Sequence, residues 1–198
     1  MMSSSEEKLE KFVKRSLAVN AAGAHTYDHI RRVYLLAKMI GTTMGADMRV
    51  LGAAALLHDV GRPRETETGV SHSILSGEMS KDVLIEAGYT QEEIKHIDDA
   101  IGTHRFSEGL TPTSKEGEVL SDADKLDAIG AIGVFRAVSQ AATEDRGIEG
   151  FLRHADEKLL KLHQLMYTKK GRVLAKRRNA FLQEFVNRLR EESCHQAV

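Results

Sequence analysis

The pair His58-Asp59 closes a strongly apolar stretch over residues 46–57, and it is the part of the sequence best suited to chemistry. Apolar runs of this kind form protein cores, where a buried carboxylate costs several kcal/mol unless another group compensates its charge. A divalent metal ion is a suitable partner, because it binds deprotonated carboxylates and neutral imidazoles. The pair therefore predicts a metal site with further ligands elsewhere in the chain.

Two other segments carry polar side chains on faces that periodicity turns inward. His29 lies four residues before Val33 on the apolar face of an expected helix. The segment 120–130 is apolar apart from three aspartates and one lysine, and helical spacing places Asp124 and Asp127 on one apolar stripe. Both aspartates are therefore candidates to face the interior.

The order His29, then His58-Asp59, then Asp124 resembles the HD superfamily of metal-dependent phosphohydrolases, and most closely its small single-domain microbial members. The bare dipeptide is a weak signal, but the ordered set with its neighbours is specific. The neighbouring segments that also resemble the family are residues 25–33, 56–61, 71–78 and 122–133.

The resemblance implies that His29, His58, Asp59 and Asp124 bind one divalent metal ion. Two imidazoles and two carboxylates suit Mn, Fe, Co, Zn, Ni or Mg, and the sequence does not choose among them. A water activated by the metal is expected to attack phosphorus.

Further residues are expected to bind substrate or a second ion. His72 and His104 either hold a second metal, with Asp59 as the bridge, or bind substrate phosphate; both alternatives stay open. The cations Lys125 and Arg105 are expected to bind phosphoryl oxygens. His25, four residues before His29, is expected to contact substrate.

Catalytic roles are expected for four residues: Lys125 offsets charge, Glu78 or Asp127 acts as general base or orients a ligand, and Asp59 binds metal. The expected enzyme is a phosphatase, a phosphodiesterase or a nucleoside-triphosphate pyrophosphohydrolase acting on a phosphoester or phosphoanhydride bond, with a nucleotide as substrate. Two rival functions are an HD-fold di-iron oxygenase and a catalytically silent module that senses a nucleotide.

Helices must position these residues, because helical periodicity recurs along the whole chain and no run alternates long enough to predict a sheet. Loops are expected over 61–70 and 105–115. We predict an all-α globule of about seven to nine helices. The helices are expected over residues 6–19, 28–40, 47–60, 71–87, 90–104, 116–141, 148–166 and 169–192.

The whole chain, 1–198, is expected to form a single HD domain. Its motif core spans about 25–136, the C-terminal helices over 148–192 pack on that core, and residues 1–5 and 193–198 are flexible. No internal repeat or linker divides the sequence.

Composition excludes several classes of protein. With 198 residues, 41% hydrophobic and 29% charged, the chain resembles an ordinary globular protein. Its one cysteine, Cys194, rules out a disulfide framework, and its polar, acidic start lacks the features of a secretory signal. We therefore expect a cytoplasmic protein with no membrane partner, and a homo-oligomer stays open.

Some charged residues have simpler interpretations. The basic segment 169–178 is interpreted as a solvated helix face rather than a nucleic-acid site, because it lacks interleaved aromatics and the chain has a net charge of −1. Arg62 and Arg64 are interpreted as loop charges, Asp122 as a solvated or capping residue, and Arg136 as a helix cap or the partner of a carboxylate.

Overall fold

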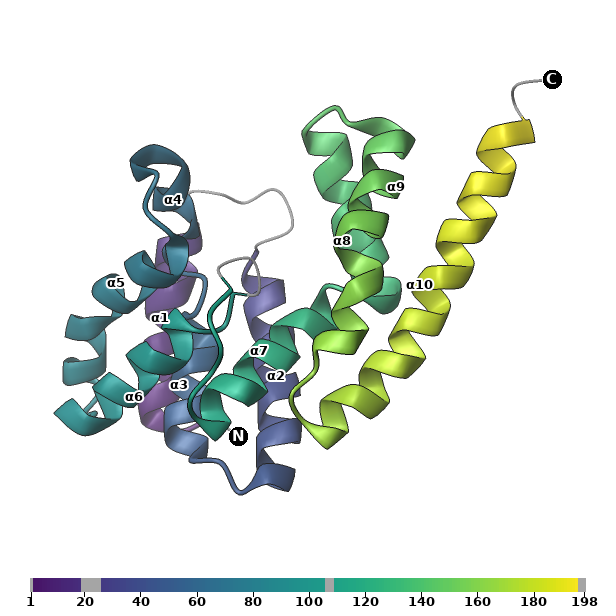
Figure 1. Cartoon of the computed structure of the whole chain (residues 1–198). Helices are drawn as coiled ribbons and strands as arrows, with labels where there is room; N and C mark the ends of the chain where they lie inside the picture. Colours follow the sequence, from purple (N-terminus) through teal and green to yellow (C-terminus); the bar gives the residue numbers. More distant parts are fainter. Residues whose placement is uncertain (1, 19–25, 106–108, 196–198) are drawn as a thin grey trace. The chain divides into compact units, whose positions relative to one another are not determined.

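The computed structural model describes residues 2–18, 26–105 and 109–195. Within these residues it contains ten α-helices, one 3₁₀ helix and no strand (Figure 1), which confirms the all-α prediction. The helices are α1 Ser4–Leu17, α2 Tyr27–Met44, α3 Met48–Leu57, α4 Arg62–Thr68, α5 His72–Glu86, α6 Gln91–Gly102, α7 Lys115–Asp127, α8 Gly130–Thr143, α9 Gly147–Glu157, the 3₁₀ helix η2 Leu159–Leu165 and α10 Lys169–His195.

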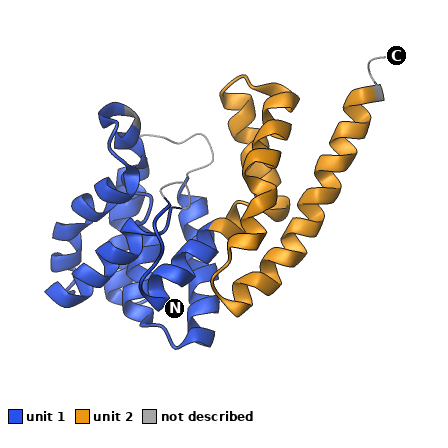
Figure 2. Ribbon diagram, in the orientation of Figure 1, with its two compact units in different colours: residues 1–124 blue, residues 125–198 orange. Residues whose placement is uncertain are grey.

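The helices form two compact units, Met1–Asp124 and Lys125–Val198, which Figure 2 shows in blue and orange. The boundary falls inside α7, so one helix contributes residues to both units. The first unit contains α1 to α6 and most of α7, and the second contains α8, α9, η2 and α10. No helix among the described residues is long and apolar enough to cross a membrane.

Helix α3 is the centre of the first unit. Every residue from Val50 to Leu57 is buried, and the helix contacts α1, α2, α5 and α6. A helix that is apolar on all sides is stable only when other elements surround it in this way. The Asp47 side chain caps its first turn by accepting hydrogen bonds from two backbone amides. His58 is its C-cap residue, so the polar pair sits where the core helix ends.

The loop predicted over 61–70 is wrong, because α4 forms there. Pro63 lies in the first turn of α4, where the N–H that proline lacks would have no helical partner. Gly61 precedes α4 and packs directly on α5. A Cβ atom at Gly61 would lie 2.6 Å from the His72 carbonyl oxygen and 2.7 Å from the Ser76 nitrogen, so a larger residue would push α5 away.

The single helix predicted over 116–141 is also wrong, because the chain divides into α7 and α8. Gly130 has a φ of +75°, a conformation that glycine adopts without strain. A Cβ atom there would lie 3.0 Å from two side-chain carbons of Arg178 on α10, so this glycine also permits close packing. The helix predicted over 148–166 is likewise two elements, α9 and η2. These divisions and α4 explain why the described part of the chain holds ten α-helices where seven to nine were expected.

Candidate metal centre

The four predicted metal ligands come from three helices of the first unit. His29 lies in the first turn of α2, His58 and Asp59 follow the last residue of α3, and Asp124 lies near the end of α7. His29, His58 and Asp59 are buried, whereas the Asp124 side chain is 28% exposed. Three helix ends therefore bring side chains separated by up to 95 residues to one place.

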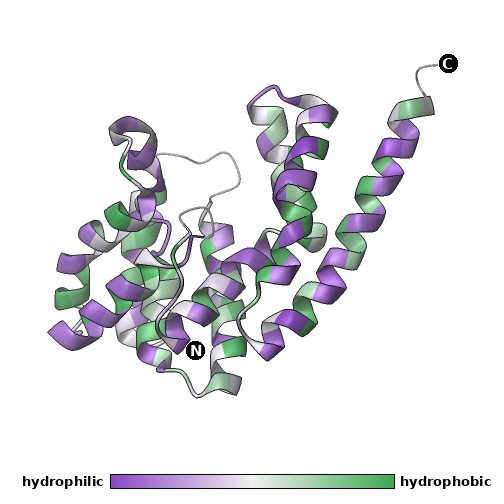
Figure 3. Ribbon diagram, in the orientation of Figure 1, coloured by the Kyte–Doolittle hydropathy of each residue, from purple (hydrophilic) through white to green (hydrophobic). Residues whose placement is uncertain are grey.

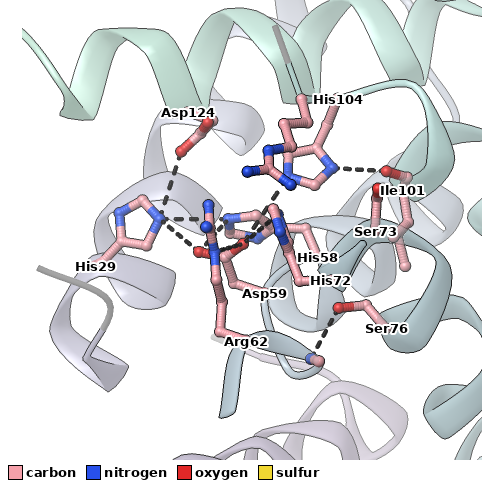
Figure 4. A network of polar contacts seen from close by, with 12 residues as sticks. His29, His58, Asp59, Arg62, His72, Ser73, Ser76, Ile101, His104 and Asp124 are labelled. Carbon is pink, nitrogen blue, oxygen red and sulfur yellow. Dashed lines mark hydrogen bonds and ion pairs between the residues drawn. The ribbon is translucent and has the colours of Figure 1, made fainter. Parts of the chain in front are cut away.

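The distances between the four side chains are those of a shared site (Figure 4). His29 Nε2 lies 3.3 Å from His58 Nε2, 3.5 Å from Asp59 Oδ2 and 3.4 Å from Asp124 Oδ1. His58 Nε2 lies 3.9 Å from Asp59 Oδ2. One ligand atom from each of His29, His58 and Asp59 falls within 4.8 Å of the other two, close enough to hold one ion.

Asp59 belongs to a second group as well, with His72 and His104. Its Oδ1 lies 3.1 Å from His72 Nε2 and 3.9 Å from His104 Nε2, and these three side chains are also close enough to hold an ion. His72 opens α5, and His104 follows α6. The Asp59 carboxylate therefore has one oxygen facing each group of imidazoles, as Figure 4 shows.

Hydrogen bonds fix the imidazole tautomers. His58 Nδ1 donates to the Ala55 carbonyl at 2.9 Å, and His104 Nδ1 donates to the Ile101 carbonyl at 2.6 Å. Because a carbonyl oxygen can only accept, each Nδ1 carries the proton. Burial lowers the pKa of His58 to about 3 and also lowers the pKa of His104, so both rings are neutral near pH 7. Each Nε2 therefore points a lone pair into the site.

This donor set fits a divalent cation. Lone pairs of His58 and His104 converge with carboxylate oxygens on a small buried space, which is electrostatically unfavourable unless a cation lies between them. His72 Nε2 is buried and makes no hydrogen bond with any described residue. Burial alone would raise the pKa of Asp124. In the acidic range where this carboxyl titrates, His29 and His58 carry positive charge that outweighs burial and lowers that pKa, so the carboxylate is ionised near pH 7 and ready to bind.

Glu65, a residue that the sequence did not suggest, organises the edge of the site. It accepts a hydrogen bond from His72 Nδ1 at 3.1 Å, from Arg62 at 3.3 Å and from Arg105 at 2.5 Å. Burial opposes its ionisation, but the hydrogen bond and charge of His72, with the charge of Arg62, lower its pKa to about 2. The signal in the sequence was its spacing of three residues from Arg62. This spacing brings two side chains together only if the segment is a helix.

The interpretation of Arg62 as a loop charge is wrong. It lies in the first turn of α4, where its Nε donates to Asp59 Oδ1 at 3.0 Å. Nearby charges on Asp59 and Asp124 outweigh burial and raise the pKa of Arg62. Asp122 is fully buried, so its interpretation as a solvated residue is also wrong.

The other predicted residues lie in different places. Arg105 joins the site through Glu65, whereas His25 lies outside the described residues. Glu78 is exposed on α5, and the structure does not bring it to the cluster. Its charge adds to burial, the main cause, in raising the pKa of Asp98.

Lys125 and Asp127 belong to the second unit. Lys125 is buried, with Nζ 4.7 Å from the centre of the Tyr167 ring. Asp127 is buried and accepts a hydrogen bond from Arg136 at 3.0 Å, which confirms that Arg136 pairs with a carboxylate.

Comparisons with known proteins identify the family of the chain. Residues 26–129 match the HD domain family. YpgQ of Bacillus subtilis, an uncharacterized protein, is 32% identical over 197 residues, covering 94% of this chain and 92% of YpgQ. The crystal structure of YpgQ in complex with ADP has a TM-score of 0.77 and 28% identity, and covers 94% of this chain and 97% of that one.

An HD-superfamily hydrolase from Bacillus thuringiensis is similar to the same extent. Its crystal structure is 31% identical, with a TM-score of 0.74, and covers 94% of this chain and 95% of its own. The family match spans half of the sequence and includes every residue of both imidazole groups. The chain therefore belongs to the HD domain family, within the HD superfamily of hydrolases.

Proposed function

We propose that the protein is a metal-dependent phosphohydrolase that cleaves a phosphoester or phosphoanhydride bond of a nucleotide. The observation that carries the proposal is the position of Asp59, whose two carboxylate oxygens face two separate groups of imidazoles. A carboxylate shared in this way is typical of two-metal hydrolytic centres.

The residues that would hold metal fall into two sets sharing Asp59. His29, His58, Asp59 and Asp124 would bind the first ion, and Asp59, His72 and His104 the second. A bound divalent ion supplies Lewis acidity, lowering the pKa of a coordinated water toward neutrality and offsetting charge on a phosphoryl oxygen. Of the two alternatives for His72 and His104, a second metal or substrate phosphate, the proposal takes metal binding.

The chain's own residues keep the ligands in position and supply positive charge. Arg62 holds the Asp59 carboxylate through Oδ1, and Glu65 turns His72 so that Nε2 faces Asp59. Arg62 and Arg105 place two guanidinium groups beside the site through Glu65. Guanidinium groups match the geometry of phosphate oxygens, so both are suited to bind the phosphates of a substrate.

The proposed catalytic residues do not have equal support. Asp59 lies at the centre of the cluster, and Lys125 directly follows the ligand Asp124 in α7, so we retain it as a cation for the phosphoryl group. Asp127 accepts a hydrogen bond from Arg136, and Glu78 is exposed, so neither environment supports action as a general base. The nucleotide part of the proposal is supported by the ADP bound to YpgQ.

Substitution of the shared pair tests the proposal. We expect Asp59→Ala and His58→Ala to reduce metal-dependent nucleotide hydrolysis by more than about 100-fold. Loss of a residue that only hydrogen-bonds to a metal ligand already lowers metal affinity or activity by about 10–100-fold. Circular dichroism should still show a helical protein. His96→Ala, at an exposed position on α6, is the matched control and should keep full activity. Full activity in Asp59→Ala would show that the site assignment is wrong.

Products and metal content separate this function from its rivals. Release of pyrophosphate, orthophosphate or a nucleoside monophosphate identifies the bond cleaved. A di-iron oxygenase would need His72 and His104 as ligands together with bound iron. The Asp59–His72–His104 group is close enough to hold an ion, so the purified protein should be analysed for iron by electron paramagnetic resonance. A mixed-valent di-iron signal without nucleotide turnover would favour the oxygenase. Tight nucleotide binding without turnover in any divalent metal would favour a silent sensing module.

A further inference from the structure

The near-neutral charge of the chain conceals a separation of charge between its two units. Residues 1–124 contain 14 lysines and arginines and 20 acidic residues, a net charge of −6. Residues 125–198 contain 14 lysines and arginines and only 9 acidic residues, a net charge of +5. Local charge rather than the total governs attraction of a polyanion. The net charge of −1 therefore gives no reason to exclude nucleic acid as a partner of the second unit.

Much of this positive charge lies on one side of α10. Lys169 and Lys176 are seven residues apart, as are Lys170 and Arg177, so each pair is aligned over two turns. All four side chains are exposed, and none forms an ion pair or hydrogen bond with any residue that the structure describes. No acidic residue interrupts α10 before Glu184. We call these four residues the cationic face. Figure 3 shows hydrophilic and hydrophobic residues alternating along α10.

The first two residues of the cationic face do not stabilise their own helix through its dipole. The helix dipole places positive charge at the N-terminus, where cations are unfavourable and acidic residues favourable. Helices α1 and α6 follow this rule with acidic first turns, whereas the first turn of α10 holds Lys169 and Lys170 and no acidic residue. These lysines therefore need an explanation outside helix stability.

A pocket beside the cationic face combines positive charge with an exposed aromatic ring. It has a volume of about 360 Å³, and Phe181 is 46% exposed. Arg178 donates a hydrogen bond to the Leu126 carbonyl, which fixes one wall of the pocket. The pocket is lined by Gly130, Ala131, Leu174, Arg177, Arg178 and Phe181.

We propose that the cationic face and this pocket bind single-stranded nucleic acid. The backbone phosphates would lie along the lysines, and an unstacked base would lie against Phe181 and Arg177. Proteins that bind single strands combine positive charge along the backbone with aromatic rings on which bases stack. A base within a duplex is stacked on both faces by its neighbours, so it would not be available to stack on Phe181. This inference goes beyond the proposed hydrolysis and replaces the interpretation of 169–178 as a solvated face, because Phe181 supplies the aromatic that the basic segment lacks.

Charge reversal tests the cationic face. A fluorescent single-stranded DNA of about 15 nucleotides is titrated by anisotropy in EDTA, where four phosphate contacts predict a slope of log K against log salt near −3. We expect Lys170→Glu/Lys176→Glu to weaken binding at least about tenfold with a shallower slope. The matched control, Lys11→Glu/Lys95→Glu, changes two exposed lysines of the first unit by the same charge and should bind as the wild type does. Equal loss in both variants would overturn the proposal.

Removal of the aromatic ring tests base recognition separately. We expect Phe181→Ala to weaken single-stranded binding about tenfold with an unchanged salt slope, because stacking does not involve counterions. Phe135→Ala, at an exposed position on α8 outside the pocket lining, should have no effect. Duplex binding as tight as single-stranded binding would overturn the proposal, as would binding to phosphatidylserine vesicles without binding to the oligonucleotide.

The test is independent of the hydrolase. Binding in EDTA and in the Asp59→Ala variant should match the wild type, so failure of the metal centre and failure of this surface give different results. Nucleotide hydrolysis by Phe181→Ala should be unchanged and reports that this variant is folded.

Discussion

At the scale of single residues, the proposed metal centre depends on the groups that orient the side chains expected to bind metal. Each of three imidazoles donates Nδ1–H to a different acceptor, and two of those acceptors are backbone carbonyls only three residues back in the chain. A carbonyl cannot be removed by substitution. Glu65, the acceptor for His72, is the exception, and it is therefore the residue whose orienting role can be tested.

We expect Glu65→Ala to weaken metal binding at the Asp59–His72–His104 group by about 10–100-fold, because His72 then loses the partner that holds its ring. Calorimetric titration with Mn²⁺ should show two ions bound to the wild type and one tight ion bound to the variant. Glu67→Ala, at an exposed position on the same helix, should leave the stoichiometry at two. Two tight ions in Glu65→Ala would show that His72 is oriented by packing alone.

At the scale of helices, α1 is attached to α2 through a buried carboxylate. Glu6 is 5% exposed and accepts hydrogen bonds from Tyr34 Oη at 2.9 Å, Lys38 Nζ at 3.2 Å and the Ser3 amide at 2.8 Å. Burial acts to raise the pKa of Glu6, but the three donors outweigh it and lower the pKa below 4.5. Ionised Glu6 therefore stabilises the folded protein.

We expect Glu6→Gln to lower the free energy of unfolding by about 1 kcal/mol at pH 7, because neutral hydrogen bonds replace charge-assisted ones. A group with a depressed folded pKa contributes stability above its unfolded pKa, here 4.5, and loses it as the pH falls through the folded value. In urea titrations, the difference between wild type and variant should therefore shrink below pH 4.5. Glu7→Gln, at the exposed position next to Glu6, should unfold with nearly the same free energy as the wild type at any pH.

At the scale of the whole molecule, the two units differ in chemistry but share a helix. The first unit is acidic and contains both imidazole groups, and the second is basic and contains the cationic face. The boundary falls inside α7, directly after Asp124. Because Asp124 and Lys125 are consecutive residues of one helix, we still expect residues 1–198 to unfold as a single domain.

Metal removal tests this expectation together with the site. At an Mn²⁺ concentration of about 100 times Kd, binding stabilises the folded state by about 2.7 kcal/mol. For a chain of this length, this raises Tm by about 5–11 °C relative to EDTA. Differential scanning calorimetry should show one transition that shifts as a whole. An equal shift in His58→Ala would show that the metal binds elsewhere, and two separate transitions would contradict the single domain.

The residues proposed to bind metal could be expected from the sequence, because the resemblance to the HD superfamily implied them and local signals agreed with it. His29 and His58 lie among apolar residues at helical spacing, and Asp59 is a charge at the end of a core helix. Glu65 and the contact of Arg62 were missed, because their three-residue spacing is informative only within a helix and their segment has the composition of a loop and contains Pro63. Glu78 was predicted from a matching segment, yet its position on α5 directs it to solvent.

The sequence by itself determined the helical class, the family and the four residues expected to bind the first metal. The helical class rests on residue type and spacing along the chain, which are local properties, whereas the family and the four ligands rest on the resemblance of the ordered motifs to the HD superfamily. Only the tertiary structure showed that Asp59 lies between two groups of imidazoles, that Glu65 joins His72 to two arginines, and that Phe181 lies beside Arg177. Such contacts arise where helices pack against one another. Hydrophobic burial drives that packing, and the spacing of residues along the chain does not indicate which polar side chains it will bring together.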